Sequence, residues 1–460
     1  MEIDVHISEQ SIVLENEMKE RMKILMLCDH PLVPSGVGTQ AKYLIEGLLS
    51  TNKYKFVVFG GAIKHPDYRP QKVAPDKFGD GNWIIYPVDG YGDKQRLREA
   101  LVNEKPDAIL LFTDPRFFTW VWEMEDEVRQ QCPILYWHVW DNDPSPAFNA
   151  AYYESTDFVS TLSLKTFGLL QDLEIQKEKF NYIPHAVSPE IFKPLSEQEC
   201  KQFKVDNFGP HADKSFIAFW NNRNARRKMT GDVIASFAKF AEKVGKRNVA
   251  LAMHTAVNDP EGQNIIEVAK KFGIDDNLII SESRVLPEVL NGFYNATDCT
   301  INIANNEGFG LSTLESMMAG SPIIAQMTGG LQFQLGDWWQ DLETFNDQDY
   351  LHEVAKRRYS NKTGTWTGIP IFPSTRSCTG SQTVPYIFDD RVSHEDVSKA
   401  LLKMFEMGRK NRREIGLNAS VWARTNFNLD SMIMNWDKTL EKQIEKFKTT
   451  KRSNIRSATL

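Results

Sequence analysis

The chain has 460 residues, of which 41% are hydrophobic and 25% are charged, a balance typical of a globular protein with two or three domains. Lys and Arg total 54 against 61 Asp and Glu, and the resulting net charge of −7 argues against a dedicated nucleic-acid-binding protein. The five scattered cysteines predict no disulfide framework and no zinc site, which favours a cytoplasmic location. No apolar run is long enough to cross a membrane, and the acidic start does not resemble a secretory signal.

The first half of the chain alternates short apolar runs with helical patterns. After an expected poorly ordered tail at 1–21, strands are predicted at 23–28, 56–61, 108–112 and 133–139. Helices are predicted at 39–50, with the apolar residues on one face, and at 94–104. This alternation indicates βαβ units and a parallel sheet, so residues 22–195 are predicted to form one α/β domain.

The alternation returns after a polar stretch at 194–214, which is typical of a connection between domains. Strands are predicted at 215–220, 248–254, 277–281, 299–304 and 322–326. Helices are predicted at 233–245, 264–273, 287–297 and 312–320. Residues 215–428 are therefore predicted to form a second α/β domain, in which 331–383 is an insertion or long loop.

The end of the chain is predicted to be helical from about 397 to 448. Residues 438–460 hold seven basic and two acidic side chains. We interpret this excess as a solvated helix face, and a patch that contacts a membrane surface is the alternative.

A glycine loop follows the first predicted strand. Residues 36–41 fit the G-x-G-x-x-A pattern of dinucleotide-binding proteins. Seven residues separate Cys28 from Gly36, and no acidic residue ends the second strand, so a nicotinamide enzyme is disfavoured. The loop can still bring backbone N–H groups and the positive end of a helix toward an anion, although a plain strand–helix turn explains the same pattern.

The strongest motif, residues 306–315, follows a strand, turns on two glycines and enters a helix. Backbone N–H groups of residues 309–312 are expected to point from the helix start toward a phosphate. Glu307 and Glu315, separated by seven residues, are placed to hold hydroxyl groups on either side of a diphosphate. The alternative is that Glu307 is a helix-start charge and Glu315 a surface residue.

Basic residues gather in 221–228, directly after the first strand of the second half. Arg223 can donate two hydrogen bonds to a phosphate, and Lys228 can lie beside it as a point charge. A charged run is usually a solvated face. Ligands nevertheless bind at the carboxyl ends of parallel strands in open sheets, which favours a binding role here.

Taken together, these motifs resemble the retaining glycosyltransferases with the two-domain GT-B fold, in particular their large family 4 group. The pair Glu307 and Glu315 is one of that group's most specific marks, and Arg223 and Lys228 have its R-x4-K spacing. Segments similar to further marks of the group lie at 35–39, 183–187, 192–194, 294–298 and 329–330. The resemblance covers residues 22–330 and resumes weakly at 384–436.

The resemblance implies two doubly wound Rossmann-like α/β domains that face each other across a cleft. A last helix at about 430–450 is implied to cross back onto the first domain. The resemblance matches Glu315 to the ribose of a nucleotide and Glu307 to the donor sugar. It matches Arg223 and Lys228 to the diphosphate leaving group.

Further donor-binding residues come from the same resemblance. Backbone groups of Phe309, Gly310 and Leu311 are implied to contact sugar and phosphate. Gly36 is implied to lie across the cleft near the diphosphate, and Val285 to contact the base. His138 is implied to face the donor sugar, and a hydrogen-bonded core histidine is the alternative.

The implied activity is transfer of a hexose from a UDP- or GDP-sugar to a hydroxyl group of a glycan or other acceptor, with retention at the anomeric carbon. The expected catalytic residues are Glu307, His138, Arg223 and Lys228. No metal or other cofactor is expected, because cations and backbone amides can stabilise the leaving group. A phosphorylase, a nucleotide-sugar epimerase and an inactive sugar-nucleotide-binding protein are the alternatives, and the sequence leaves the acceptor and the oligomeric state open.

Overall fold

The computed structural model describes residues 20–140 and 142–450, so nearly all of the predicted tail at 1–21, and residues 451–460 of the basic tail, lie outside the described residues. The chain divides into two compact units. The first comprises Met1–Trp137, Ser155–Phe158 and Ile433–Leu460, and the second comprises His138–Glu154 and Val159–Met432. In the described ranges, no helix has the length and apolar character that a membrane crossing requires.

The first sheet has eight strands in the order β3-β4-β2-β1-β5-β6-β7-β8. They are β1 (Met22–Asp29), β2 (Tyr54–Gly61), β3 (Gln71–Lys72), β4 (Trp83–Pro87), β5 (Ala108–Phe112), β6 (Ile134–His138), β7 (Phe158–Thr161) and β8 (Phe180–Tyr182). β1 pairs in parallel with β2 and β5, with Met22 opposite Tyr54 and Ile24 opposite Ala108. Such central parallel strands are covered on both faces, which explains why their sequences are nearly continuous apolar runs.

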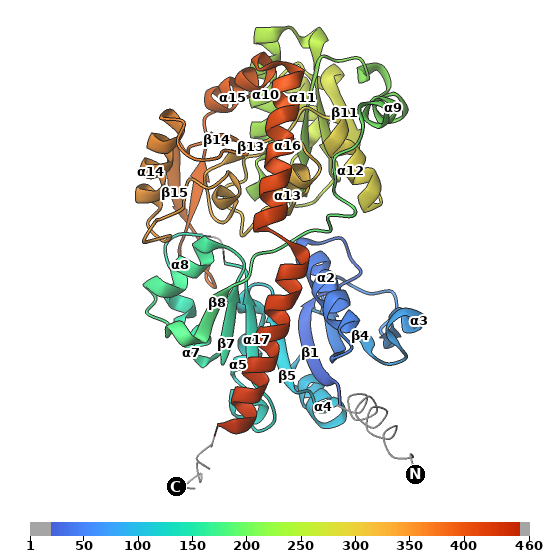
Figure 1. The fold of residues 1–460 in the computed structure, drawn as a ribbon, viewed down its shortest axis with the longest axis vertical. Helices are drawn as coiled ribbons and strands as arrows, with labels where there is room; N and C mark the ends of the chain where they lie inside the picture. The colour runs from blue at the N-terminus through green and yellow to red at the C-terminus, as the bar shows by residue number, and fades with distance from the viewer. Residues whose placement is uncertain (1–19, 141, 451–460) are drawn as a thin grey trace, which may run out of the picture. The chain divides into compact units, whose positions relative to one another are not determined.

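Helices alternate with these strands along the chain (Figure 1). They are α2 (Gly36–Ser50), α3 (Pro75–Phe78), α4 (Lys94–Glu104), α5 (Thr119–Trp122), α6 (Glu125–Val128), α7 (Ala150–Ser155) and α8 (Leu164–Asp172). The predicted helix at 94–104 has the observed bounds, and the predicted helix at 39–50 begins three residues earlier, where Ser35 caps it.

The second sheet has six strands, all parallel, in the order β11-β10-β9-β12-β13-β14. They are β9 (Phe216–Asn221), β10 (Val249–His254), β11 (Leu278–Ser281), β12 (Cys299–Asn302), β13 (Ile323–Gln326) and β14 (Gly368–Ile371). Alternate residues of one strand share a face, and Phe216, Ala218 and Trp220 of β9 lie in one buried apolar core. Helices α10 (Thr230–Val244), α11 (Ile265–Lys271) and α15 (His394–Glu406) complete that core.

A second group of helices in this unit pack against one another: α9 (Glu197–Asn207), α12 (Pro287–Ala296), α13 (Leu311–Met318) and α16 (Gly408–Asn426). Helix α9 lies inside the polar stretch that the sequence predicts as a connection. Residues 331–383 are not a long loop either, because they contain α14 (Gln348–Ser360), β14 and β15 (Thr375–Thr379), and β15 pairs with β16 (Ile387–Arg391).

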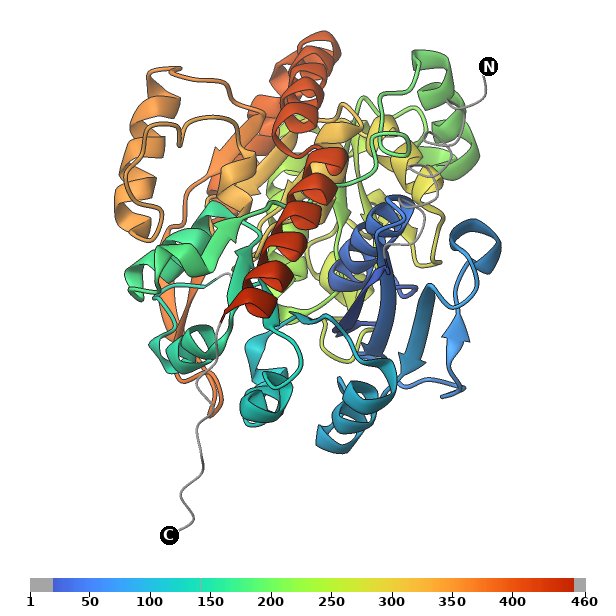
Figure 2. The same cartoon turned by 60° about the horizontal axis from the view of Figure 1, so that its bottom comes forward.

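The last helix, α17 (Leu429–Thr449), belongs to the first unit from Ile433 onward and runs beside strands of that unit (Figures 1 and 2). The Tyr54 hydroxyl donates to Asp437 Oδ1 at 2.7 Å, and the rings of Trp137 and Trp436 lie 5.0 Å apart. The α/β class with two doubly wound sheets is therefore confirmed.

Candidate functional site

The turn after β12 brings Glu307 against the cations that follow β9. Lys228 Nζ donates to Glu307 Oε1, and Arg227 Nη1 lies 3.5 Å from Glu307 Oε2. Arg227 also donates to the Asn306 carbonyl at 2.9 Å, and Asn302 Nδ2 lies 3.3 Å from Glu307 Oε1. Because β9 and β12 are parallel neighbours, their carboxyl ends meet at one edge of the sheet, where ligands bind in folds of this type.

Glu307 is buried, with 7% of its surface exposed, and stays anionic. Burial opposes ionisation, but the charges of Lys228 and Arg227 and the hydrogen bonds from Lys228 and Asn302 outweigh it. The pKa of Glu307 therefore lies below its ordinary value. An ionised carboxylate can only accept hydrogen bonds, as it would from the hydroxyl groups of a sugar.

Helix α13 starts at this turn without a side-chain cap. Gly310 has a φ of +93°, and a Cβ there would lie 2.9 Å from Leu331 Cδ1, so the position requires glycine. Gln334 Nε2 donates to the carbonyls of Phe309 and Gly310 at 2.7 and 3.0 Å. The turn is thus held from its carbonyl side, while the first N–H groups of the helix have no partner within it and can receive an anion.

Glu315, one turn into α13, lies in a second polar cluster. The Tyr294 hydroxyl donates to Glu315 Oε2 at 2.7 Å, and Asn221 Nδ2 donates to the same hydroxyl at 2.7 Å. Burial raises the pKa of Glu315 to about 7, although the bond from Tyr294 opposes the shift. The carboxyl group therefore changes charge near neutral pH.

Arg223 contacts a different partner from Lys228. Its guanidinium donates to both oxygens of Asp259, at 2.6 and 3.0 Å, and its side chain is 63% exposed. Val285 is partly exposed in the loop between β11 and α12. The structure thus brings together Lys228, Glu307 and the turn at 309–311, whereas Arg223 is paired elsewhere.

His138 ends β6 and is fully buried. Its Nε2 lies 2.9 Å from the Tyr153 hydroxyl, and the two rings pack edge to face. Burial lowers the pKa of His138 to about 3, so the ring is neutral. This setting fits the hydrogen-bonded core histidine, and a role toward a sugar stays a prediction.

Gly36 is the first residue of α2, in the first unit. Ser35 caps this helix by accepting from the Gly38 N–H at 2.9 Å, and its hydroxyl donates to Asp29 Oδ2 at 2.6 Å. Asp29 also accepts from the Tyr91 hydroxyl at 2.9 Å. A carboxylate of the chain itself therefore already lies below the positive end of α2.

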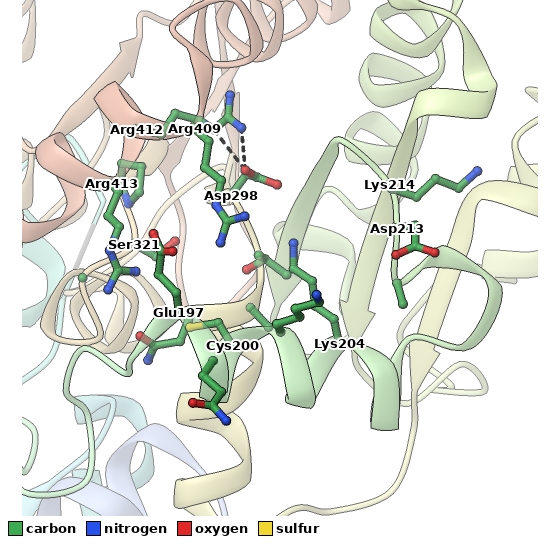
Figure 3. A pocket seen from close by; sticks show the side chains of 18 residues that line it. Glu197, Cys200, Lys204, Asp213, Lys214, Asp298, Ser321, Arg409, Arg412 and Arg413 are labelled. Atoms are coloured by element: carbon green, nitrogen blue, oxygen red, sulfur yellow. Dashed lines mark hydrogen bonds and ion pairs between the residues drawn. The ribbon is translucent and has the colours of Figure 1, made fainter.

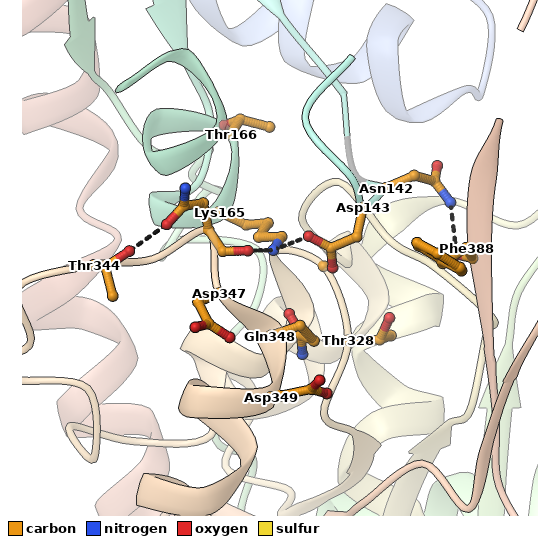
Figure 4. A network of polar contacts seen from close by, with 12 residues as sticks. Asn142, Asp143, Lys165, Thr166, Thr328, Thr344, Asp347, Gln348, Asp349 and Phe388 are labelled. Carbon is orange, nitrogen blue, oxygen red and sulfur yellow. Dashed lines mark hydrogen bonds and ion pairs between the residues drawn. The ribbon is translucent and has the colours of Figure 1, made fainter. Parts of the chain in front are cut away.

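A buried ion pair joins the loop after β6 to the segment before α14 (Figure 4). Lys165, whose side chain is fully buried, donates to Asp143 Oδ1 and, at 2.9 Å, to the Asn346 carbonyl. Phe388 N–H donates to the Asp143 carbonyl at 2.7 Å. Asp143 is therefore a structural link within the second unit, and Asp141 lies outside the described residues.

Arg227, Asn302, Tyr294 and Gln334 are site residues to which sequence reasoning assigned no role. Arg227 belongs to the basic run and Tyr294 to a segment similar to the family, so the sequence singled out both segments. It did not show which residues Arg227 and Tyr294 contact. Gln334 carried no signal, because it acts through main-chain carbonyls of a turn far away in sequence.

Known proteins resemble this chain in sequence and in fold. A family model described as "Glycosyl transferases group 1" matches residues 202–353. A trehalose synthase of Pyrococcus horikoshii is 27% identical over 225 residues, which are 43% of this chain and 54% of that protein. The aligned part thus spans about half the length of that relative.

Two solved structures share the fold over nearly the whole chain. The sucrose-phosphate synthase of Thermosynechococcus elongatus has a TM-score of 0.68 at 15% identity, covering 93% of this chain and 100% of that one. Anabaena Alr3699/HepE in complex with UDP-glucose has a TM-score of 0.65 at 13% identity, covering 92% and 100%. At these identities the likeness establishes the fold.

Proposed function

We propose that this chain, which belongs to the GT-B glycosyltransferases of group 1, transfers a hexose from a UDP- or GDP-sugar to an acceptor hydroxyl group, with retention at the anomeric carbon. The family match at 202–353 contains Lys228, Glu307 and Glu315. Alr3699/HepE was solved with UDP-glucose, which supports a UDP-sugar as the first donor to test. A cytoplasmic location belongs to the same proposal.

The observation that carries the proposal is the contact of Lys228 and Arg227 with Glu307 beside the uncapped start of α13. The cations and the helix N–H groups stabilise negative charge, and the carboxylate accepts hydrogen bonds from hydroxyl groups. A diphosphate attached to a sugar presents both kinds of group next to each other. On binding, Lys228 contacts the diphosphate as well as Glu307. Glu307 then accepts hydrogen bonds from the hydroxyl groups of the sugar.

The remaining roles in this proposal come from the resemblance to the family. Glu315 accepts from the ribose, Val285 contacts the base, and Arg223 exchanges Asp259 for the diphosphate. His138 contributes to the donor site through a neutral ring.

In the reaction, the bond between the anomeric carbon and the diphosphate oxygen breaks, and the acceptor oxygen bonds to the carbon on the same face. The acceptor proton moves to the departing diphosphate. Charge grows on that diphosphate in the transition state, so Lys228 and the amides at 309–311 contribute most there. No metal is part of this proposal.

A donor screen tests the proposal. Purified protein is incubated with UDP-, GDP- and ADP-sugars, with and without hydroxyl acceptors, and nucleoside diphosphate release is measured. We expect release with one donor class that increases with an acceptor and yields a product of retained configuration. Release of sugar phosphate would indicate a phosphorylase, donor isomerisation an epimerase, and donor binding without turnover an inactive binding protein.

A further inference from the structure

A basic pocket lies at the opposite edge of the second sheet from Glu307 (Figure 3). It has a volume of about 540 Å³, and α9 and α16 contribute most of its charged side chains. Its wall also includes residues that directly precede β9, β12 and β13, whereas the candidate donor site follows β9 and β12. The six residues of β9 separate the two edges by about 20 Å.

Cations dominate the charged side chains of the basic pocket. Its three carboxylates are Glu197, Asp213 and Asp298. Its six cations are Lys201, Lys204, Lys214, Arg409, Arg412 and Arg413. In Figure 3, Asp213 and Lys214 lie apart from the three arginines, so the arginine side of the pocket has the larger excess of positive charge.

Only part of this charge is neutralised by the protein. Arg412 is buried and donates to Asp298 Oδ1 at 2.6 Å, which makes it a structural ion pair. By contrast, the side chains of Lys204 and Arg409 form no hydrogen bond or ion pair with another described residue. Ser321, 3% exposed in the same wall, has a hydroxyl oxygen without a hydrogen-bond partner among the described residues.

The surroundings of Lys204 disfavour its positive charge. Burial lowers the pKa of its ammonium group, Arg409 and Arg412 lower it further, and Asp298 opposes them. An ammonium group that is partly buried among like charges costs free energy unless an anion accompanies it. A dianion between Lys204 and the arginines would offset both the cost of desolvation and the repulsion.

We propose that the basic pocket binds a small molecule through a phosphate group, at a site separate from the donor site. Arginine forks suit phosphate oxygens, and the volume is that of a small-molecule site. A nucleic acid is disfavoured because the chain has a net charge of −7. The inference goes beyond the proposed function and does not depend on it.

Calorimetry with inorganic pyrophosphate at low salt tests the proposal. The Lys228→Ala variant serves as the background, because it weakens pyrophosphate binding at the donor site. We expect this background to retain a binding site whose affinity falls at least tenfold with Lys204→Met or Arg409→Gln, since one charged hydrogen bond contributes about 1.5–3 kcal/mol. Arg409 is exposed, so its variant keeps the fold even where Lys204→Met does not.

The matched control is Lys410→Ala, which removes an exposed charge from the same helix outside the pocket. Equal affinities in all variants, or no binding in the Lys228→Ala background, would overturn the proposal.

A second experiment uses phosphatidylcholine vesicles that contain phosphatidic acid. Sedimentation that depends on Arg409 assigns the phosphate to a lipid headgroup, and pyrophosphate binding without such sedimentation assigns it to a soluble ligand.

Discussion

Two turns of the molecule lead from a buried parallel strand into a helix, one after β1 and one after β12. In the first, Ser35 caps α2, and Asp29 lies beneath the cap. In the second, no side chain caps α13, and Glu307 is held by Lys228 instead of by the helix. The first turn satisfies its helix end with groups of the chain, whereas the second leaves that end for a ligand.

The difference teaches that a glycine-rich turn is not by itself an anion site. The pattern at 36–41 fits a phosphate-binding fingerprint, yet a carboxylate of the chain already lies at that helix end. The α13 turn does not complete that fingerprint, but it has adjacent cations and helix N–H groups without a side-chain cap. Mutations at the two turns should therefore have different effects on ligand binding.

The largest effect is expected for Lys228→Ala, next to the α13 turn. Loss of a charge that acts mainly in the transition state costs about 2–4 kcal/mol, or roughly 30- to 1000-fold in turnover. Steady-state kinetics with the donor from the screen measure it, and Arg226→Ala removes a neighbouring exposed charge as the control. Unchanged turnover with only a raised Michaelis constant would contradict this role.

Variants of Glu315 and Glu307 should differ in which ligand they bind more weakly. Glu315→Ala should weaken the nucleoside diphosphate and the sugar nucleotide alike, by about 10- to 100-fold, because both carry ribose. Glu307→Ala should weaken only the sugar nucleotide, because it removes a sugar contact and releases Lys228 for the phosphate. Calorimetry with both ligands decides, and an identical pattern for the two variants would defeat the assignment.

The two glycines give a direct test of the comparison between the turns. Gly310→Ala places a side chain at positive φ against Leu331, so the free energy of unfolding should fall by about 1–2 kcal/mol and donor binding should weaken. Gly36→Ala replaces the first residue of a capped helix and should have little effect on either. Chemical denaturation measures the free energy of unfolding. Equal losses of stability in the two variants would contradict the proposed difference between the turns.

A smaller effect is expected from pH. Because burial raises the pKa of Glu315 to about 7, the free protein gains a carboxylate as pH rises through that value. Ribose hydroxyl groups donate to the ionised form, so nucleotide affinity should rise several-fold between about pH 6 and 8, with proton release on binding. Calorimetry in buffers of different ionisation enthalpy measures the proton. Glu315→Gln should abolish the pH dependence of nucleotide affinity. If the pH dependence persists in this variant, another group is responsible for it.

No effect is expected from chelation. The diphosphate is assigned to cations and backbone amides, so EDTA should leave turnover unchanged and magnesium should add nothing. Asp143, in the loop after β6, is paired with Lys165. Loss of turnover with EDTA, restored by magnesium or manganese, would contradict the charge assignment.

Elements with strong apolar periodicity were predictable from the sequence. Helix α4 and strands β1 and β5 are recognised within one or two residues, because their apolar spacing follows from burial. Helix α9 was missed because Cys200 is its only buried residue, so it has no apolar stripe. Its capping box of Ser196 and Glu199 was the available signal.

Some residues of the candidate site were predictable from the sequence, but their contacts were not. The motif at 306–315 and the basic run named Glu307 and Lys228, but only folding brings these two side chains, 79 positions apart, into an ion pair. The same applies to the pairing of Arg223 with Asp259, since one sequence does not show which strand-end loops become neighbours. Charge state follows from such contacts, which is why the pKa of Glu315 had no sequence signal.

Helix α17 has a consequence for the order in which the protein folds during synthesis. The first unit contains β1 near one end of the chain and Ile433–Leu460 at the other. Until Asp437 and Trp436 are translated, the buried Tyr54 hydroxyl has no acceptor from α17, and the ring of Trp137 has not yet met that of Trp436. The ribosome must therefore complete the whole second unit before the first unit can close, so the segment made first finishes folding last.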